Sequence, residues 1–308
     1  MIVAENIRQT RVELPHVVLT IGSFDGVHLG HQRILQETAA SVHAANGTAA
    51  VLTMRPHPRE FFSPDHPPNL LTNDTKKLEL LAQHGADAVF FLPFDEDAAQ
   101  LEPEAFLTEI LLDRCGAREL VVGHDFCFGK GARGDFHFLE QQADRLGFAV
   151  KQVPPVLIDG ERVSSTLVRE RILSGDLEGA RMLLGRRYSV MGKVLRGRGI
   201  GRSLGFPTAN IQPYHTAIPA QGVYAAEVLY GDTPRAAAVN IGIAPTIRHD
   251  GETIEAHLLD FDTDITGQQL EVIFHHRLRP ERKFPSREAL VEQIGRDVAA
   301  IRAYFDAA

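Results

Sequence analysis

The hydrophobic pattern changes its period near residue 186, and this change constrains the fold more than any other feature of the sequence. Before it, short apolar runs at residues 17–21, 49–53 and 88–92 alternate with helical patterns such as residues 32–45. Further helices are expected over residues 104–114 and after Phe138, and further strands over residues 120–122 and 148–153. This order is typical of βα units and predicts a doubly wound parallel sheet, which binds ligands beyond the carboxyl ends of its strands.

After residue 186 the apolar residues tend to recur at every second position. Strands are expected over residues 189–195, 222–229, 236–241, 254–259 and 270–274, and Gly, Pro and Asp separate them. This is the pattern of an antiparallel barrel. From Ser286 onwards, Leu290, Ile294 and Ile301 share one helical face, which predicts an amphipathic helix against the barrel. The sequence therefore predicts two domains, residues 1–185 and 186–308.

Composition and charge argue against several classes of protein. Forty acidic residues against 32 basic ones give a net charge of −8, which is unusual for a protein that coats nucleic acid. Cys115 and Cys127 cannot build a disulfide framework and have no CxxC spacing. The N-terminus lacks the pattern of a secretory signal, and no apolar stretch approaches the roughly 20 residues that span a bilayer. We expect a cytoplasmic protein with small-molecule substrates and neither nucleic acid nor membrane as a partner; its oligomeric state does not follow from the sequence.

The first predicted strand runs directly into GSFDGVHLGH, residues 22–31, and a predicted helix follows at once. Gly22, Ser23, Phe24 and Gly30 form a turn in which the backbone can approach a phosphate, and the helix N-terminus favours anions. His28 and His31 can add hydrogen bonds to phosphoryl oxygens where negative charge builds up. The alternatives are two incidental surface histidines, or a metal site for which no third ligand has a fitting spacing. The GxGxxG of a dinucleotide site is absent.

A second phosphate-type motif, VSSTLVR, covers residues 163–169 near the end of the predicted first domain. Ser165 and Thr166 can cap a helix while offering hydroxyl donors, and Arg169, with Arg162, can neutralise phosphate charge. The alternative is a plain Ser/Thr helix cap.

Two further runs follow predicted strands and should lie at the same edge of the sheet. TMRPHP, residues 53–58, contains a rigid Pro-His-Pro turn. GHDFCFG, residues 123–129, contains Phe126 and Phe128, which suit contact with a planar ring. For both phenylalanines a core position is the alternative.

The predicted barrel carries its own candidate site. Thr208 and Asn210 present oxygens two residues apart on an extended segment, which suits a hard cation. Glycines at positions 197, 201 and 205 would let a loop close over phosphates, the alternative being a glycine-rich barrel turn.

The alternation around residue 255 places Glu255 and His257 on one face of a strand. A carboxylate that faces a barrel mouth is costly unless it is used or paired, so Glu255 is a candidate general base. The alternative is a surface glutamate on an edge strand.

The HxGH motif and its VSSTLVR partner resemble the nucleotidylyltransferase superfamily. Over nearly the whole chain, the sequence resembles the bacterial bifunctional riboflavin kinase/FMN adenylyltransferases, or FAD synthetases. The further motifs that carry this resemblance are GRSLGFPTAN, GVYAAEV, VNIGIAPT, EAHLLDF and the tail RPERKF. The resemblance implies a nucleotidylyltransferase domain followed by a riboflavin kinase barrel with a C-terminal helix. It also implies that ATP and Mg²⁺ are used to convert riboflavin to FMN and FMN to FAD.

The same resemblance implies a role for each candidate residue. His28 and His31 would contact ATP phosphates, Thr208 and Asn210 would hold Mg²⁺ and ATP, and Glu255 would take the proton from the riboflavin 5′-hydroxyl. The remaining phosphate contacts would be Ser164, Ser165, Thr166 and Arg169, and the flavin contacts Pro56, His57, Pro58, Asp125, Phe126 and Phe128.

Three positions depart from the family pattern: Cys127 stands where Arg is usual, Arg187 where Pro is common, and Thr266 where Tyr is expected. Two other functions remain open, an HxGH enzyme with a different acceptor and a non-catalytic flavin-binding sensor or chaperone.

Overall fold

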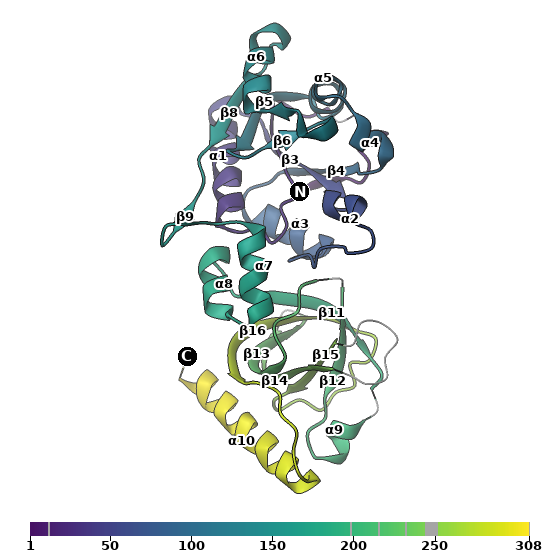
Figure 1. The fold of residues 1–308 in the computed structure, drawn as a ribbon, viewed down its shortest axis with the longest axis vertical. Coiled ribbons are helices and arrows are strands. Elements are labelled where there is room, and N and C mark those ends of the chain that lie inside the picture. Colours follow the sequence, from purple (N-terminus) through teal and green to yellow (C-terminus); the bar gives the residue numbers. More distant parts are fainter. Residues whose placement is uncertain (12, 198, 215, 232, 244–251, 308) are drawn as a thin grey trace. The chain divides into compact units, whose positions relative to one another are not determined.

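The fold follows the two-part pattern of the sequence. The computed structural model describes residues 1–11, 13–197, 199–214, 216–231, 233–243 and 252–307 (Figure 1). They divide into one unit of Met1–Pro68 with Asp74–Ser164 and another of Asn69–Asn73 with Ser165–Ala308. Residues 69–73 belong to the second unit, in which Leu70 forms a parallel bridge with Thr216 and its carbonyl accepts a 2.6 Å hydrogen bond from the Ala217 amide.

The first unit is built on a six-stranded sheet with the order β1-β4-β3-β2-β5-β8, in which all neighbours are parallel. Its strands are β1 (Ile2–Ala4), β2 (Val17–Ile21), β3 (Thr48–Arg55), β4 (Ala88–Pro93), β5 (Ala117–Gly123) and β8 (Ala149–Val153). All five residues of β2 are buried, as expected for a central strand of a covered parallel sheet. Because β2 lies between β3 and β5, the turn after it sits where the strand order reverses, the usual ligand position in such folds.

Helices and short ribbons complete this unit. They are α1 (Leu29–Ala45), α2 (Pro58–Phe62), α3 (Asp74–Gln83), α4 (Glu96–Gln100), α5 (Pro103–Ala105), η1 (Phe106–Arg114), β6 (Cys127–Phe128), η2 (Lys130–Ala132), β7 (Gly134–Asp135), α6 (Phe136–Leu146), β9 (Leu157–Ile158) and β10 (Glu161–Arg162). The helix expected over residues 104–114 is mostly a π-helix, since the Cys115 amide donates to the carbonyl five residues earlier at Ile110, 2.9 Å away. A period near 3.6 in the sequence does not separate these two helix types.

The second unit contains a closed barrel with the order β11-β12-β15-β14-β13-β16. Its elements are α7 (Ser165–Ser174), α8 (Leu177–Leu184), β11 (Ser189–Leu195), α9 (Ile200–Ser203), β12 (Ala209–Pro213), β13 (Gly222–Tyr230), β14 (Thr233–Ile243), β15 (Glu252–Leu258), β16 (Gln269–Arg279) and α10 (Arg287–Asp306). Strand β12 was not predicted, because only Ile211 of its five residues is buried and no apolar alternation marks it.

The long last helix begins where the sequence predicts. Ser286 caps α10, its hydroxyl accepting a hydrogen bond from the Ala289 amide at 3.2 Å. The helix packs against β13 and β14, with Ile301 fully buried beside Ala225 and Leu259 (Figure 1). The parallel-sheet unit, the antiparallel barrel and the terminal helix are thus all confirmed. None of the helices in the described part of the chain is long and apolar enough to cross a membrane.

Candidate active sites

The turn after β2 holds a strained backbone. Phe24 and Val27 have φ values of 49° and 40°, in the left-handed region that costs non-glycine residues about 1–3 kcal/mol each. The surrounding structure holds this conformation: the Phe24 ring is buried, and the Gln32 amide donates to the Val27 carbonyl at 2.9 Å. The carbonyl of Ser23 accepts from the Thr53 hydroxyl at 3.2 Å. Such strain is typical of a site that must present its backbone in one geometry.

His28 and His31 lie together at the start of α1. Their rings stack with centroids 3.7 Å apart, and His28 Nδ1 accepts a 3.3 Å hydrogen bond from the His31 amide. A neutral His28 therefore carries its proton on Nε2. A side chain at Gly30 would place its Cβ 3.1 Å from the His28 ring, so glycine allows this packing.

His31 is held neutral. Burial is the main cause that brings the pKa of His31 well below its usual value, and the neighbouring His28 and Lys77 add to this. Its Nδ1 is buried and makes no hydrogen bond within the described residues. A buried polar atom without a protein partner indicates a site for a polar ligand or water. A neutral histidine can donate one hydrogen bond to a phosphoryl oxygen without itself being a nucleophile.

The VSSTLVR motif straddles the boundary between the two units. Val163, directly before Ser164, lies beside the HxGH turn, since a Cβ on Gly30 would be 3.6 Å from its carbonyl oxygen. Ser165 begins α7 in the second unit, where Thr166 is exposed and Arg169 Nε donates to the Asn69 carbonyl at 2.6 Å.

The Pro-His-Pro turn follows β3 and starts a helix. His57 is the N-cap of α2, with Nδ1 accepting from the Arg59 amide at 3.1 Å, while Glu60 accepts from the His57 amide at 2.8 Å. Pro56 is exposed, and Pro58 opens the helix. The His57 ring is therefore oriented by a capping box. The sequence did not predict this structural role of His57.

An aromatic cluster lies beyond this turn. The rings of Phe61, Phe62 and Phe94 have centroids 5.3–5.7 Å apart, and Phe62 is 65% exposed. Phe94 directly follows β4, so the cluster sits at the carboxyl edge of the sheet, the edge from which the HxGH turn also leaves. No local signal marked these residues as functional. An exposed aromatic cluster at a ligand-binding edge suits contact with a flat ring.

The GHDFCFG run divides between surface and core. Asp125 is exposed and forms a 3.1 Å ion pair with Arg162. Phe126 is half-buried, whereas Phe128 belongs to the hydrophobic core and contacts Phe106. Of the two phenylalanines, Phe126 is the one the structure leaves accessible to a flavin.

The barrel unit contains a pocket of about 610 Å³, a volume typical of small-molecule sites. Thr208, Asn210 and Gly197 all line it, together with Arg196, Gly199, Arg202, Asp262, Asp264 and Thr266 among others. Arg196 and Arg202 face the charge of Asp264, and both contribute to a lowered pKa of that carboxyl, whose first cause is the hydrogen bond from Thr266. The pocket therefore combines cationic side chains with hydroxyl and amide oxygens.

Two glycines of the predicted loop make room for Thr208 and Asn210, although only Gly197 of the three predicted glycines lines the pocket. A Cβ on Gly197 would lie 2.0 Å from Asn210 Nδ2, and a Cβ on Gly201 would lie 3.0 Å from Thr208 Oγ1. Gly205 has a φ of 87°, so it provides the left-handed turn that leads into the strand. Gly197 and Gly201 of the predicted loop thus pack against the predicted cation ligands, whereas a Cβ on Gly205 would meet nothing within 4 Å.

Glu255 and His257 share one face of β15, as the alternation predicts. Ile254, Ala256 and Leu258 are buried, while Glu255 and His257 are half-buried. Glu255 lies opposite Asn210 of β12 and also opposite Asn240 of β14, so three polar residues form one row across the barrel wall. His257 Nδ1 is 2.7 Å from the carbonyl oxygen of Pro207, which joins this face to the glycine loop. Glu255 is not among the residues that line the 610 Å³ pocket, but it is the register partner of one that does.

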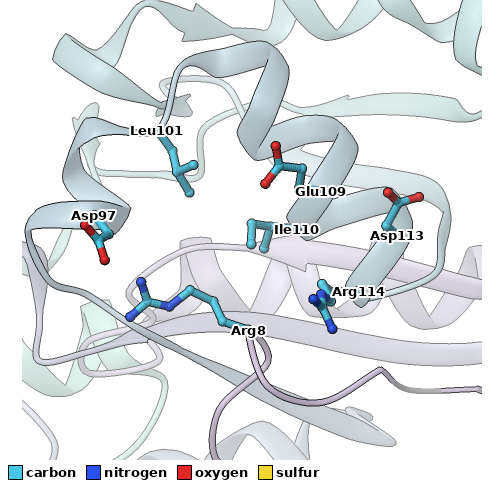
Figure 2. A pocket seen from close by; sticks show the side chains of 7 residues that line it. All are labelled: Arg8, Asp97, Leu101, Glu109, Ile110, Asp113 and Arg114. Atoms are coloured by element: carbon cyan, nitrogen blue, oxygen red, sulfur yellow. The ribbon is translucent and has the colours of Figure 1, made fainter.

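Another hollow, in the first unit, contains none of the predicted site residues. It has a volume of about 300 Å³, and Figure 2 shows Glu109, Asp113 and Arg114 reaching it from η1, with Arg8 on the other side. Among the described residues, no three His, Cys, Asp or Glu side chains gather to hold a metal ion here or elsewhere.

Comparison with known proteins identifies the family of both units. The FAD synthetase family matches residues 10–167, and the riboflavin kinase family matches residues 184–305. A bifunctional riboflavin kinase/FMN adenylyltransferase from Pseudomonas fluorescens is 39% identical over 304 residues, 98% of this chain and 97% of its own. The chain belongs to the bifunctional riboflavin kinase/FMN adenylyltransferase family. The relative from Escherichia coli strain K12 is 37% identical over 94% of this chain and 92% of its own.

One solved structure supports the same architecture. A crystal structure from Streptococcus pneumoniae described as a macrolide-efflux protein matches with a TM-score of 0.88 and 28% identity, over 98% of both chains. The family confirms the prediction from the motifs: the chain has riboflavin kinase and FMN adenylyltransferase activities, with the FAD synthetase part N-terminal and the kinase part C-terminal. Of the matched motifs, residues 244–246 of VNIGIAPT lie outside the described residues.

The contact between Gly197 and Asn210 predicts a kinase-specific defect. In Gly197→Ala the new methyl must displace the Asn210 side chain, because the two would otherwise be 2.0 Å apart. We expect riboflavin phosphorylation to fall by roughly one to two orders of magnitude, since small displacements of positioning groups have effects of this size. FMN adenylylation measured on the same sample should stay unchanged. Gly295→Ala, where an added Cβ meets nothing within 4 Å, is the matched control; equal kinase rates in the two variants would contradict the expectation.

Proposed function

We propose that the two activities divide between the two sites described above. The barrel pocket phosphorylates riboflavin, and the HxGH turn is the site where FMN is adenylylated. This assignment is supported by the presence of one candidate phosphate site in each unit. These sites are the HxGH turn after β2 and the barrel pocket lined by Gly197, Thr208 and Asn210. We place the domain boundary after residue 185, close to the start of the riboflavin kinase match at residue 184. The compact units of the structure divide earlier, after Ser164, and α7 and α8 belong to the second unit.

In the kinase step, Glu255 is the general base. Its carboxylate accepts the proton of the riboflavin 5′-hydroxyl while that oxygen attacks the γ-phosphorus of ATP, and ADP leaves. Thr208 and Asn210 would hold Mg²⁺ and, with it, the phosphates of ATP. Their hydroxyl and amide oxygens fit a hard cation. When bound, Mg²⁺ supplies neutralisation of phosphate charge.

In the adenylyl transfer step, no general base is required. An oxygen of the FMN phosphate, already ionised, attacks the α-phosphorus of ATP, and pyrophosphate leaves with the electrons of the broken bond. His28 and the neutral His31 donate hydrogen bonds to the phosphoryl oxygens, and the N-terminus of α1 favours the negative charge of those oxygens. The backbone of Gly22, Ser23, Phe24 and Gly30 lies against the same phosphates.

The flavin contacts proposed for this step are the Pro56-His57-Pro58 turn, Asp125, Phe126 and Phe128. The cap that orients His57 and the accessibility of Phe126 support their part, whereas Phe128 acts by packing behind Phe126, with ring centroids 5.3 Å apart. Ser164, Ser165, Thr166 and Arg169 stay predicted phosphate contacts, and the cytoplasmic location stays a prediction.

The direct test is to incubate the purified protein with riboflavin, ATP and Mg²⁺ and to separate the flavins by chromatography with fluorescence detection. We expect FMN to appear first and FAD to accumulate from it. FMN alone would contradict the adenylylation site and direct attention to Cys127. Retention of riboflavin without consumption of ATP would favour a flavin-binding sensor, and conversion of other phosphate esters in preference to FMN would favour a different acceptor.

A further inference from the structure

Lys77 is a buried cation to which the proposed mechanism gives no role. It lies on the buried face of α3 with Leu80 and Leu81, and its side chain is only 4% exposed. Lysine is almost never fully buried unless it is paired. Its ion pair with Asp74 is long, with 4.0 Å between Nζ and Oδ1, well beyond hydrogen-bond distance. A buried ammonium with so weak a partner in the protein needs a further explanation.

The helix that carries Lys77 packs against the HxGH turn, since Leu80 and Leu81 of α3 belong to one core cluster with Phe24 and Val27 of that turn. The charge of Lys77 acts on His31, where it contributes to the lowered pKa of that ring. Asp25, which lies inside the GSFDGVHLGH motif and is 1% exposed, and Arg55, which precedes the Pro-His-Pro turn, both act on Lys77 in turn. The ammonium is therefore in the electrostatic field of the turns that follow β2 and β3.

The chemistry of that site calls for a fixed positive charge. FMN and ATP together carry several negative charges, while the neutral ring of His31 supplies a hydrogen bond and no charge. A desolvated ammonium beside them would neutralise phosphate charge without reorganisation at the moment of transfer. The matching electrostatic role in many phosphoryl-transfer sites is played by Lys or Arg.

We propose that Lys77 contacts a phosphoryl group during adenylyl transfer, an inference that rests on the proposed placement of this reaction at the HxGH turn. The group belongs either to ATP or to FMN, and the chemistry of recognition is the same for both. In the step, the FMN phosphate oxygen forms a bond to the α-phosphorus, the bond from that phosphorus to the bridging oxygen breaks, and pyrophosphate departs with the electron pair.

The test is the kinetics of Lys77→Met in both directions of the reaction. We expect the forward rate from FMN to FAD to fall about 10- to 100-fold, the effect of losing one hydrogen bond to a charged group. The reverse reaction, from FAD and pyrophosphate, distinguishes the source of the phosphoryl group. A raised KM for pyrophosphate assigns the contact to the phosphates of ATP that leave as pyrophosphate. A raised KM for FMN in the forward direction assigns it to the flavin phosphate. A loss in kcat alone assigns it to the transferred phosphoryl group of ATP.

Controls separate this role from a structural one. Lys151→Met removes a 45% exposed lysine paired with Glu37 and should leave all these constants unchanged. Riboflavin phosphorylation by Lys77→Met should also stay at the wild-type rate. Should Lys77→Met fail to fold, as judged by thermal unfolding and near-UV circular dichroism, Lys77→Gln keeps a polar side chain and is expected to show the same loss.

The proposal is overturned if kcat and both KM values of a folded variant lie within twofold of wild type. It is also overturned if the loss is matched by a fall in thermal stability and reversed by a stabilising condition, because Lys77 would then be a structural counter-ion of Asp25 and Asp74. A wild-type protein that makes no FAD would instead contradict the proposed function itself.

Discussion

Glu255→Gln should stop riboflavin phosphorylation and leave the conversion of FMN to FAD at the wild-type rate. Glutamine preserves the size of the side chain and removes its capacity to take a proton. A positioned general base contributes about 10²–10⁴-fold to a rate, so the kinase activity should fall by about three orders of magnitude. The measurement is the initial rate of FMN formation from riboflavin, beside that of FAD formation from supplied FMN.

The polar row across the barrel sharpens this expectation. Glu255 lies opposite Asn210 in the ladder, so the proposed base and a proposed ligand of Mg-ATP face the same side of neighbouring strands. Residues so placed can position the acceptor hydroxyl and the γ-phosphate together. Because the change removes a proton acceptor and not a binding contact, KM for ATP should stay within a few-fold of wild type.

The matched control is Glu292→Gln on α10, where the glutamate is 66% exposed and paired only along its own helix with Arg296 in the contacts that the structure gives for it. This surface change should alter neither activity. If Glu255→Gln kept more than a tenth of the kinase rate, Glu255 would be a surface glutamate and another group would act as the base. A loss of both activities without unfolding would contradict the assignment of the two reactions to separate sites.

The sequence predicted those parts of the fold whose signal is local. The apolar run of β2 and the helix after it are marked by residues next to one another, and the structure places β2 over the predicted residues, Val17–Ile21. Strand β12 carries no such local signal. Its extended conformation is set by hydrogen bonds to β11 and β15, which are distant in the sequence. The sequence also did not separate the π-helix η1 from an α-helix, because its buried residues, Phe106 and Ile110 among them, give a pattern that fits either helix type.

For the candidate sites too, the sequence predicted the residues marked by local patterns and missed those that depend on tertiary contacts. The alternation placed Glu255 and His257 on one face, and the spacing brought Thr208 and Asn210 into one pocket. Lys77 could not be recognised, since a lysine in a polar helical pattern reads as an exposed residue until the tertiary structure buries it. The cap formed by His57 and the core position of Phe128 also depend on contacts that no spacing in the sequence encodes.

His31→Ala should abolish FAD formation and leave FMN formation unchanged. The neutral ring stacks on His28 with a centroid distance of 3.7 Å, so its removal takes away one donor and also frees the His28 ring to move. Loss of a single donor to a developing oxyanion lowers a rate by about 10²–10³-fold, and the loosened His28 should bring the effect to the upper end of that range. The measurement is FAD formation from FMN and ATP, with riboflavin phosphorylation followed in a parallel sample.

His137→Ala provides the control, because that histidine is 72% exposed on α6 and only its local contacts would be lost. Removing a buried ring also leaves a cavity, so unfolding must be followed in each variant. His31→Gln then separates the two effects: it restores a donor of similar reach but not the stacking. If the glutamine variant recovered activity while the alanine variant did not, hydrogen-bond donation to the phosphate would be the part that matters. If neither folded variant formed FAD, the stacked pair of rings itself would set the geometry of transfer. FAD formation at the wild-type rate in His31→Ala would contradict any role of the HxGH turn in the mechanism.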